Sequence, residues 1–421
     1  MPQFKKYKLG ELITHKKGFA FKSKDYSANG VPIVRVSDLT EDSVDLSNCL
    51  HVNKNLAVTF SDYSLKKDDM VITTVGSWQY NPASVVGKII RVPESANNTL
   101  LNQNAVRLRA NEKTNQHFIF YRLKCDDFKE YIVTGAQGSA NQAAITLEQI
   151  FGFEFDLPDL PTQTLIASIL SSLDDKIELN RRTNHTLEQI AQTLFKKYFV
   201  DDIDPENLPE GWRWGKLDEI ISVKHGYAFE GKYFTEDANE NILLTPGNFK
   251  IGGGFNYNKF KYYNGEIPKD YILLKNDLIV TMTDLSKDGD TLGYSALTPV
   301  IQGKEILHNQ RIGKVLFKES DRLKYFLFWL MRSEDYRSFV LGSATGTTVK
   351  HTSPTRICEY SCAIPPENIL TEFNKIIEVL VEKELTNQSK IEILSKVRDS
   401  LLPKLMSGEI EVNTTEKELV N

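Results

Sequence analysis

Neighbouring aspartates are the residues of this chain that most suggest catalysis, because closely placed carboxylates can hold a divalent metal for hydrolysis. Adjacent side chains point in different directions from a strand or a helix, and no ordered metal-site pattern with a neighbouring lysine accompanies these pairs. Cys358, Cys362 and His351 are a poor zinc set, because the first half of the chain offers no equivalent. We therefore interpret the acids as solvated surface residues and helix caps. The pairs are Asp68–Asp69, Asp126–Asp127, Asp174–Asp175 and Asp201–Asp202.

Three other motifs approach a known chemistry without completing it. An amino-methyltransferase would hold its target with Asn or Asp, two prolines and an aromatic residue; Tyr80–Ala83 lacks the second proline and the aromatic. Ile364–Glu367 lacks the amide and the aromatic. The glycine loop Gly342–Lys350 does not satisfy the GxxxxGK[ST] phosphate-loop pattern. We therefore expect no catalytic residue, cofactor or metal in this chain.

Composition is typical of a globular protein with two or three domains. The chain has 421 residues, of which 41% are hydrophobic and 25% charged. No stretch approaches the roughly 20 apolar residues of a membrane span. Four cysteines without a CxxC motif indicate a reducing cytoplasm. The net charge of −5 does not favour a nucleic-acid protein, but residues 3–24 hold seven lysines against one acid, a local patch compatible with DNA binding.

The chain contains two copies of one module. Leu9–Phe21 (LGELITHKKGFAF) and Leu217–Phe229 (LDEIISVKHGYAF) are identical at seven of thirteen positions, 208 residues apart. The register returns downstream, where Lys66–Thr73 matches Lys275–Thr281 and Asn102–Gln103 matches Asn309–Gln310. A period this long indicates a tandem duplication of a whole domain rather than a solenoid, so we expect a pseudo-twofold molecule.

Each copy begins with a strand-rich mixed α/β domain and ends in a long helix. Short β-branched runs bounded by turn residues predict strands at Pro32–Val36, Met70–Thr73 and Val85–Ile90, and Phe118–Lys124 and Tyr325–Arg332 predict helices. We expect mixed α/β domains over 1–157 and 203–363, helical regions over 158–202 and 364–410, and a flexible tail over 411–421.

The two helical regions predict an antiparallel intramolecular coiled coil. Apolar residues recur at alternating steps of four and three from residue 166 and again 207 residues later. Asn180 and Asn387 occupy the same place in the two copies, and we expect them to pair and set the register, although both could be exposed. The expected seam is Ile166, Leu170, Leu173, Ile177, Asn180, Leu187, Leu194, Phe373, Ile377, Leu380, Asn387, Ile391, Leu394 and Leu401.

This arrangement resembles the specificity (S) subunit of type I DNA restriction-modification systems. Leu208–Trp212 followed by Lys216–Ile220 resembles the opening of a target recognition domain in that family, and Ser400–Ile410 resembles its C-terminal segment. The order domain, helix, domain, helix covers essentially the whole chain. Phe4 stands where the second copy has Trp212, so the first domain lacks that entry motif.

The resemblance implies a definite role. Each target recognition domain would read one half of a split double-stranded DNA sequence. The helices would dock two modification subunits, which bind S-adenosylmethionine and methylate adenine at N6. Two restriction subunits can join and cleave with ATP and Mg²⁺. The S subunit of a prokaryotic cytoplasm would itself do no chemistry.

Polar segments that differ between the two copies are the candidates for DNA contact, since base reading needs donors and acceptors on base edges and other groups on phosphates. We interpret the paired amides Asn102–Gln103 and Asn309–Gln310 as framework residues, because both copies have them. Surface drift or structural turns would explain the other segments equally well. The candidates are Thr73, Thr74, Ser77, Gln79, Tyr80, Asn81, Gln137 and Ser139; Thr281, Thr283, Asp284, Ser286, Lys287, Thr345 and Thr347; and, for phosphates, Lys16, Lys17, Lys22, Lys224, Arg311 and Lys350.

Three other functions stay open from the sequence. The same architecture could serve another methylation or defence complex. A free-standing DNA-binding regulator could use it to read a split operator. An enzyme with an unrecognised site is the most distant alternative.

Overall fold

The computed structural model describes residues 5–40, 42–46, 48–77, 86–139, 142–257, 260–286, 288–346 and 349–412, and of Ser139 and Gln142 only the backbone. The expected tail over 411–421 lies mostly outside these residues. The chain forms two compact units, one of Met1–Ile177 with Ile393–Asn421 and one of Glu178–Glu392. The division falls inside both long helices, so the predicted domain boundaries stay a prediction.

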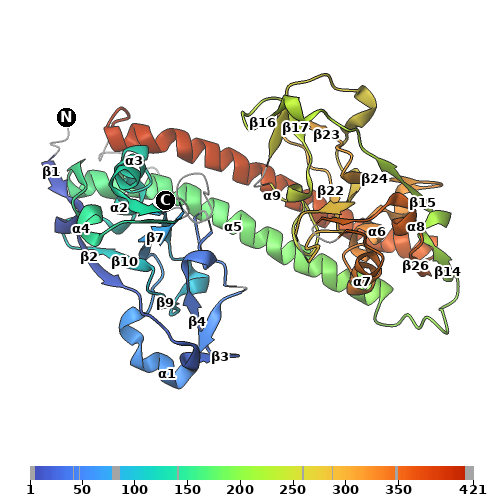
Figure 1. The fold of residues 1–421 in the computed structure, drawn as a ribbon, viewed down its shortest axis with the longest axis horizontal. Helices are drawn as coiled ribbons and strands as arrows, with labels where there is room; N and C mark the ends of the chain where they lie inside the picture. The colour runs from blue at the N-terminus through green and yellow to red at the C-terminus, as the bar shows by residue number, and fades with distance from the viewer. Residues whose placement is uncertain are drawn as a thin grey trace. The chain divides into compact units, whose positions relative to one another are not determined.

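Unit 1 contains the first α/β domain (Figure 1). Its central sheet has the order β2-β10-β6-β8, a second sheet has the order β3-β5-β4-β9, and β1 pairs with β13. The helices are α1 (Lys54–Thr59), α2 (Gln116–Arg122), α3 (Asp126–Gly135) and α4 (Leu147–Phe151). The strands are β1 (Lys5–Lys8), β2 (Ile13–Lys17), β3 (Tyr26–Ser27), β4 (Val31–Val34), β5 (Leu50–Val52), β6 (Met70–Thr73), β7 (Val75–Gly76), β8 (Ile89–Arg91), β9 (Leu100–Leu101), β10 (Ala105–Ala110), β11 (Gln137–Ser139), β12 (Gln142–Ala144) and β13 (Glu154–Leu157).

Unit 2 repeats this plan. Its central sheet has the order β15-β24-β20-β22, the second sheet β16-β18-β17-β23-β19, and β14 pairs with β26. The helices are α6 (Lys324–Leu330), α7 (Glu334–Gly342) and α8 (Pro354–Cys358). The strands are β14 (Arg213–Lys216), β15 (Ile221–His225), β16 (Phe234–Thr235), β17 (Asn241–Leu243), β18 (Lys261–Tyr263), β19 (Ile272–Leu273), β20 (Leu278–Thr281), β21 (Thr283–Asp284), β22 (Ser295–Leu297), β23 (Glu305–Leu307), β24 (Ile312–Phe317), β25 (Lys350–His351) and β26 (Ser361–Ile364).

Each central sheet separates two hydrophobic cores. Every side chain of β6 is buried, and because successive side chains point to opposite faces, Met70 and Ile72 join one core while Val71 joins the other. In β20, Leu278 and Val280 face one core and Ile279 the other. One core packs the sheet against helices, and the other packs it against the second sheet. Such two-sided burial explains why both strands are continuous apolar runs.

The two long helices are α5 (Leu160–Phe199) and α9 (Glu367–Ser407), which pack antiparallel (Figure 1). Asp159 caps α5, because its Oδ1 accepts the Thr162 N–H at 2.9 Å. The domain cores extend onto both helices: Ile166 and Leu170 of α5 and Leu405 of α9 belong to the unit 1 core. The fold is therefore the duplicated domain–helix arrangement that the sequence predicts.

Most predicted elements are found within two residues, with one clear exception. The strand expected over Val85–Ile90 is β8, which begins only at Ile89. Gly87 has a φ of 77°, and a Cβ there would lie 2.3 Å from Ile132 Cγ2. A turn at this glycine delays the strand.

Candidate nucleic-acid interface

Strand register places the predicted DNA contacts of the first domain at one end of its central sheet. Thr73, the last residue of β6, pairs with Ala105 at the start of β10. Val106 pairs with Lys17, the last residue of β2. The end of β6, the start of β10 and the end of β2 therefore meet, and Lys16, Lys17 and Thr73 share this sheet end.

The second domain has the same arrangement. Thr281 of β20 pairs with Ile312 at the start of β24, and Lys224 of β15 pairs with Lys314 two residues further along. Arg311 precedes β24 at the same end. The two sheet ends are thus built alike, from segments about 208 residues apart in the sequence.

Short strands bring the two distant polar segments of each domain together. In the first domain, β12 pairs with β7 through Ala143 and Gly76 and also with β11. In the second domain, Asp284 of β21 pairs with Lys350 of β25. The segments that follow Gly135 and Gly342 therefore contain strands that attach them to the residues following β6 and β20, which a sequence pattern does not reveal.

A lysine held over a tyrosine ring marks this end of each sheet. The Lys16 Nζ lies 4.7 Å from the centroid of Tyr63 and 3.5 Å from Asp62 Oδ2. The Lys224 Nζ lies 4.6 Å from the centroid of Tyr271 and donates to the carbonyl of Asp270 at 3.2 Å. A cation–π contact restrains a flexible lysine while leaving its ammonium able to meet an anion.

Tyr63 and Tyr271 were not among the predicted site residues, although the sequence carries a signal for them. The dipeptides Asp62–Tyr63 and Asp270–Tyr271 stand 208 residues apart, as do the two lysines. Comparing the copies for repeated pairs of residue types, rather than for long identical segments, would have found them.

Six predicted base-reading residues are buried and bonded inside their own domains, so the structure shows them in a framework role while their DNA contact stays a prediction. Thr74 Oγ1 donates to the carbonyl of Asn104 at 3.2 Å, and Thr283 Oγ1 lies 3.2 Å from His351 Nδ1. Such hydrogen bonds hold the strand ends in place. The six are Thr73, Thr74, Ser77, Thr281, Thr283 and Asp284, all at most 9% exposed.

Asp284 shows most clearly how such a residue serves the fold. Its carboxylate accepts the Ser286 N–H at 2.6 Å and the Thr291 hydroxyl at 2.5 Å. Burial opposes ionisation, but these hydrogen bonds outweigh it and lower the pKa of Asp284. The carboxylate is therefore charged at neutral pH and fully engaged in closing its turn.

The remaining candidates divide by exposure. Lys17, Lys22, Gln137, Arg311 and Thr345 are exposed, and Ser286 and Lys350 are half-buried. These seven stay predictions, because burial alone does not test a DNA contact. Gln79, Tyr80, Asn81, Lys287 and Thr347 lie outside the described residues, as does the side chain of Ser139.

The paired amides belong to the framework of each sheet end. Asn309 Oδ1 accepts the Arg311 N–H at 3.1 Å, and Tyr227 forms a parallel bridge with Asn309, as Phe19 does with Asn102. The preceding Gly226 is required, because a Cβ there would lie 2.2 Å from the Asn309 carbonyl oxygen. The glycine shared by both copies thus permits a close backbone approach.

The helix pair corrects one predicted contact. In unit 2, Asn387 Nδ2 donates to Asn184 Oδ1 at 2.8 Å, and Asn184 Nδ2 donates to the carbonyl of Glu384 at 3.1 Å. The partner of Asn387 is therefore Asn184, not Asn180. The helices pair one turn away from the expected register. In the observed register, Tyr198 packs on Phe373 with ring centroids 5.8 Å apart.

The other seam residues are distributed along both units. In unit 1, Ile166, Leu170 and Ile177 are buried, and Leu173, Leu394 and Leu401 are half-buried. In unit 2, Phe373, Ile377, Asn387 and Ile391 are buried, and Asn180, Leu187, Leu194 and Leu380 are half-buried.

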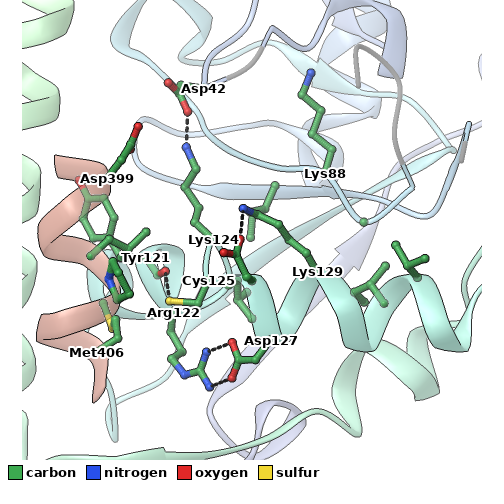
Figure 2. Close-up of a pocket in the computed structure, with 18 of the residues that line it drawn as sticks. Asp42, Lys88, Tyr121, Arg122, Lys124, Cys125, Asp127, Lys129, Asp399 and Met406 are labelled. Carbon is green, nitrogen blue, oxygen red and sulfur yellow. Dashed lines mark hydrogen bonds and ion pairs between the residues drawn. The ribbon is translucent and has the colours of Figure 1, made fainter. Parts of the chain in front are cut away.

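A cavity of about 790 Å³ in unit 1 lies between the α2–α3 turn and the last turns of α9 (Figure 2). Its charged groups are paired: Arg122 Nη1 lies 2.7 Å from Asp127 Oδ1, and Lys129 Nζ lies 2.8 Å from Asp126 Oδ1. Burial raises the pKa of Cys125 to about 11, so its thiol is protonated at neutral pH. The cavity thus offers no activated nucleophile among the described residues.

Comparison with known proteins identifies the family. The sequence model described as "Type I restriction modification DNA specificity domain" matches residues 1–189 and again 209–395. This chain belongs to the type I restriction-modification DNA specificity family. The two matches coincide with the two copies of the duplicated module. Among the described residues, no helix combines the length and the apolar character needed to cross a bilayer.

Relatives within this specificity family resemble the chain over most of its length. The chain is 28% identical over 313 residues to the type I restriction enzyme MjaIX specificity subunit of Methanocaldococcus jannaschii, covering 70% of this chain and 69% of the relative. It is 24% identical over 355 residues to the HindI specificity subunit of Haemophilus influenzae, covering 70% and 77%. The crystal structure of a type I S subunit from M. genitalium matches with a TM-score of 0.57 at 16% identity, covering 96% of both chains, which supports the fold.

Proposed function

We propose that this chain is the DNA specificity subunit of a type I restriction-modification complex, in which each α/β domain reads one half of a split DNA target. The observation that carries this proposal is the repetition of one polar sheet end in two domains whose polar residues differ. A shared framework with different exposed groups suits two domains that bind the same kind of molecule and read different sequences.

The lysines at the sheet ends support contact with the DNA backbone. Lys16 and Lys224 present ammonium groups that a cation–π contact and an aspartate hold in place, and Lys17 and Arg311 are exposed beside them. Neutralising phosphates supplies the sequence-independent part of DNA affinity. Base reading would then fall to exposed polar groups such as Gln137 and Thr345.

The helices would act as the spacer between the two half-sites. At 1.5 Å per residue, the 40-residue α5 extends about 60 Å, a length that spans one to two turns of B-DNA. Two domains carried on such helices could reach sites separated by bases that are not read.

Catalysis would belong to partner subunits in the prokaryotic cytoplasm. We propose that two modification subunits, binding S-adenosylmethionine, dock on the helices, and that two restriction subunits using ATP and Mg²⁺ can join them. The chain itself is the non-catalytic component of the system.

The test is a genome-wide methylation map in a host that lacks DNA methylation. Cells would carry the modification subunit encoded beside this chain, either alone or with the chain. N6-methyladenine at one split motif, present only with both proteins, is the expected result. Copurification without any split motif would assign the chain to another complex. Tight binding to a split operator without any partner would instead indicate a regulator.

A second experiment tests which segment carries specificity. Residues 135–141 would be replaced by the matching segment of the second copy, residues 342–350. We expect the half of the motif that the first domain reads to change. An unchanged motif would show that this segment carries no specificity.

A further inference from the structure

A buried ion-pair network in unit 1 ties the recognition domain to both long helices. Arg398 of α9 is 8% exposed. Its Nη1 lies 2.8 Å from Asp174 Oδ1 of α5 and 3.4 Å from Asp42 Oδ2. The other oxygen of Asp42 pairs with Lys124, in the turn between α2 and α3 (Figure 2). The Tyr121 hydroxyl donates to Asp174 at 2.6 Å. Each buried charge thus has an opposite partner, as burial requires.

Unit 2 has no charge at the equivalent positions of the helix pair. The two helices correspond residue for residue at a separation of 207, because α5 begins at Leu160 and α9 at Glu367. Arg398 therefore corresponds to Ala191, and Asp174 corresponds to Val381. Ala191 and Val381 are both buried in the unit 2 core and line the same small cavity of about 50 Å³.

Both basic and acidic side chains line that place in unit 2, the acidic ones being Glu188 and Glu384. Lys250 and Arg332 line the same cavity as Ala191. The Arg332 Nη2 lies 2.5 Å from Glu188 Oε1, and Glu188 is on α5, one turn before Ala191. In unit 1, α9 of the second copy thus brings Arg398 to carboxylates of the first copy. In unit 2, α5 of the first copy brings Glu188 to Arg332 of the second copy.

Because of these opposite polarities, the two long helices are not equivalent partners for either domain. If the first copies of two chains paired with each other, Ala191 would stand where Arg398 stands, and Asp174 and Asp42 would lose that partner. If two second copies paired, Glu188 would be absent, and Arg398 would join Arg332 and Lys250 as a third cation beside the remaining carboxylate Glu384. Either exchange leaves buried charge unpaired or against like charge.

We propose that these charges key each recognition domain to the long helix of the other copy, and so disfavour the pairing of like copies from two chains. Without such keys, two copies of one module could pair like with like, because their apolar seams are similar. The keys concern pairing within the chain and do not depend on the proposed function in DNA recognition.

The experiment co-expresses two full-length copies of the chain with different affinity tags, without partner subunits, and measures capture of one tag with the other. In the variant Arg398→Glu, the introduced carboxylate would face Asp174 and Asp42 within the chain. In a second chain it would replace Glu188 as the partner of Arg332 and Lys250, beside Glu384. We expect co-capture to rise roughly tenfold or more over the unmodified chain, because like-charge contacts cost enough for such a shift.

Matched variants distinguish a change in which copies pair from a loss of folding stability. Arg398→Lys keeps the sign of the charge and should give the co-capture of the unmodified chain. Asp174→Arg combined with Arg398→Glu restores an opposite pair within the chain and should remove the co-capture. Where Arg398→Glu is recovered only as aggregate, Glu188→Arg tests the key of unit 2 in the same way. Soluble variants without co-capture, or co-capture that the restored pair does not reverse, would overturn the proposal.

Discussion

Replacing the two asparagines of the helix seam tests whether their hydrogen bond sets the energy of that contact. Asn387 is 2% exposed, whereas Asn184 is half-buried. Asn184→Leu would leave the Asn387 amide without its acceptor in a place that water does not reach, at a cost of about 2–3 kcal/mol. Asn387→Leu would leave the Asn184 carbonyl without its donor, but water can reach that group, and we expect a loss of about 1 kcal/mol.

The double variant should recover most of the stability. With both amides gone, no buried polar group lacks a partner, and two leucines meet in an apolar seam. We expect a stability near that of the unmodified chain, so the two single losses are not additive.

Thermal unfolding of unit 2 measures the relative stability losses of these three variants. A loss of 1 kcal/mol in a unit of this size lowers Tm by roughly 2–4 °C, so Asn184→Leu should unfold several degrees below Asn387→Leu. Equal losses in the two single variants, or additive losses in the double variant, would refute the argument from burial.

Three further predictions concern single residues. Burial lowers the pKa of His308 to about 4, below an ordinary value of about 6.5, so the unfolded state binds more protons between these values. Stability should therefore fall by about 3 kcal/mol as the pH drops through this window, with about 2 kcal/mol of that loss between pH 7 and pH 5, and His308→Leu, which copies Leu101 of the first domain, should remove that loss in thermal unfolding at these two pH values. Lys16→Ala and Lys224→Ala should each weaken DNA binding by the assembled complex and reduce its salt slope by about 1, whereas Lys113→Ala, beyond the opposite end of the sheet, should change neither. Gly226→Ala should destabilise unit 2 by about 1–3 kcal/mol in chemical denaturation, while Gly342→Ala, where a Cβ meets nothing within 4 Å, should not.

The duplication and the order of domain and helix were predictable from the sequence because both are written in local patterns. The match of Leu9–Phe21 with Leu217–Phe229 is a property of the residues themselves, and the spacing of apolar residues after 166 and 373 predicts long helices without any contact being known. The structure confirms the helices as α5 and α9. The spacing of apolar residues and the identity between the two copies can both be read without knowing any tertiary contact.

The site itself was only partly predictable. The sequence locates polar segments after the strands of each domain, but it does not tell a buried threonine from an exposed one. Thr74 and Asp284 have residue types suited to DNA and are instead bonded to their own backbone. The contact of Lys16 with Tyr63 joins residues of different strands and loops, so only folding brings them together.

Tertiary structure alone decided the register of the helices. A shift by one turn keeps the same apolar stripe on each helix, so the pattern permits Asn387 to face either Asn180 or Asn184. Packing of Tyr198 on Phe373, together with the hydrogen bond between Asn387 and Asn184, selects one register. A repeat of residue types specifies that two helices pair, whereas the fit of particular side chains specifies where.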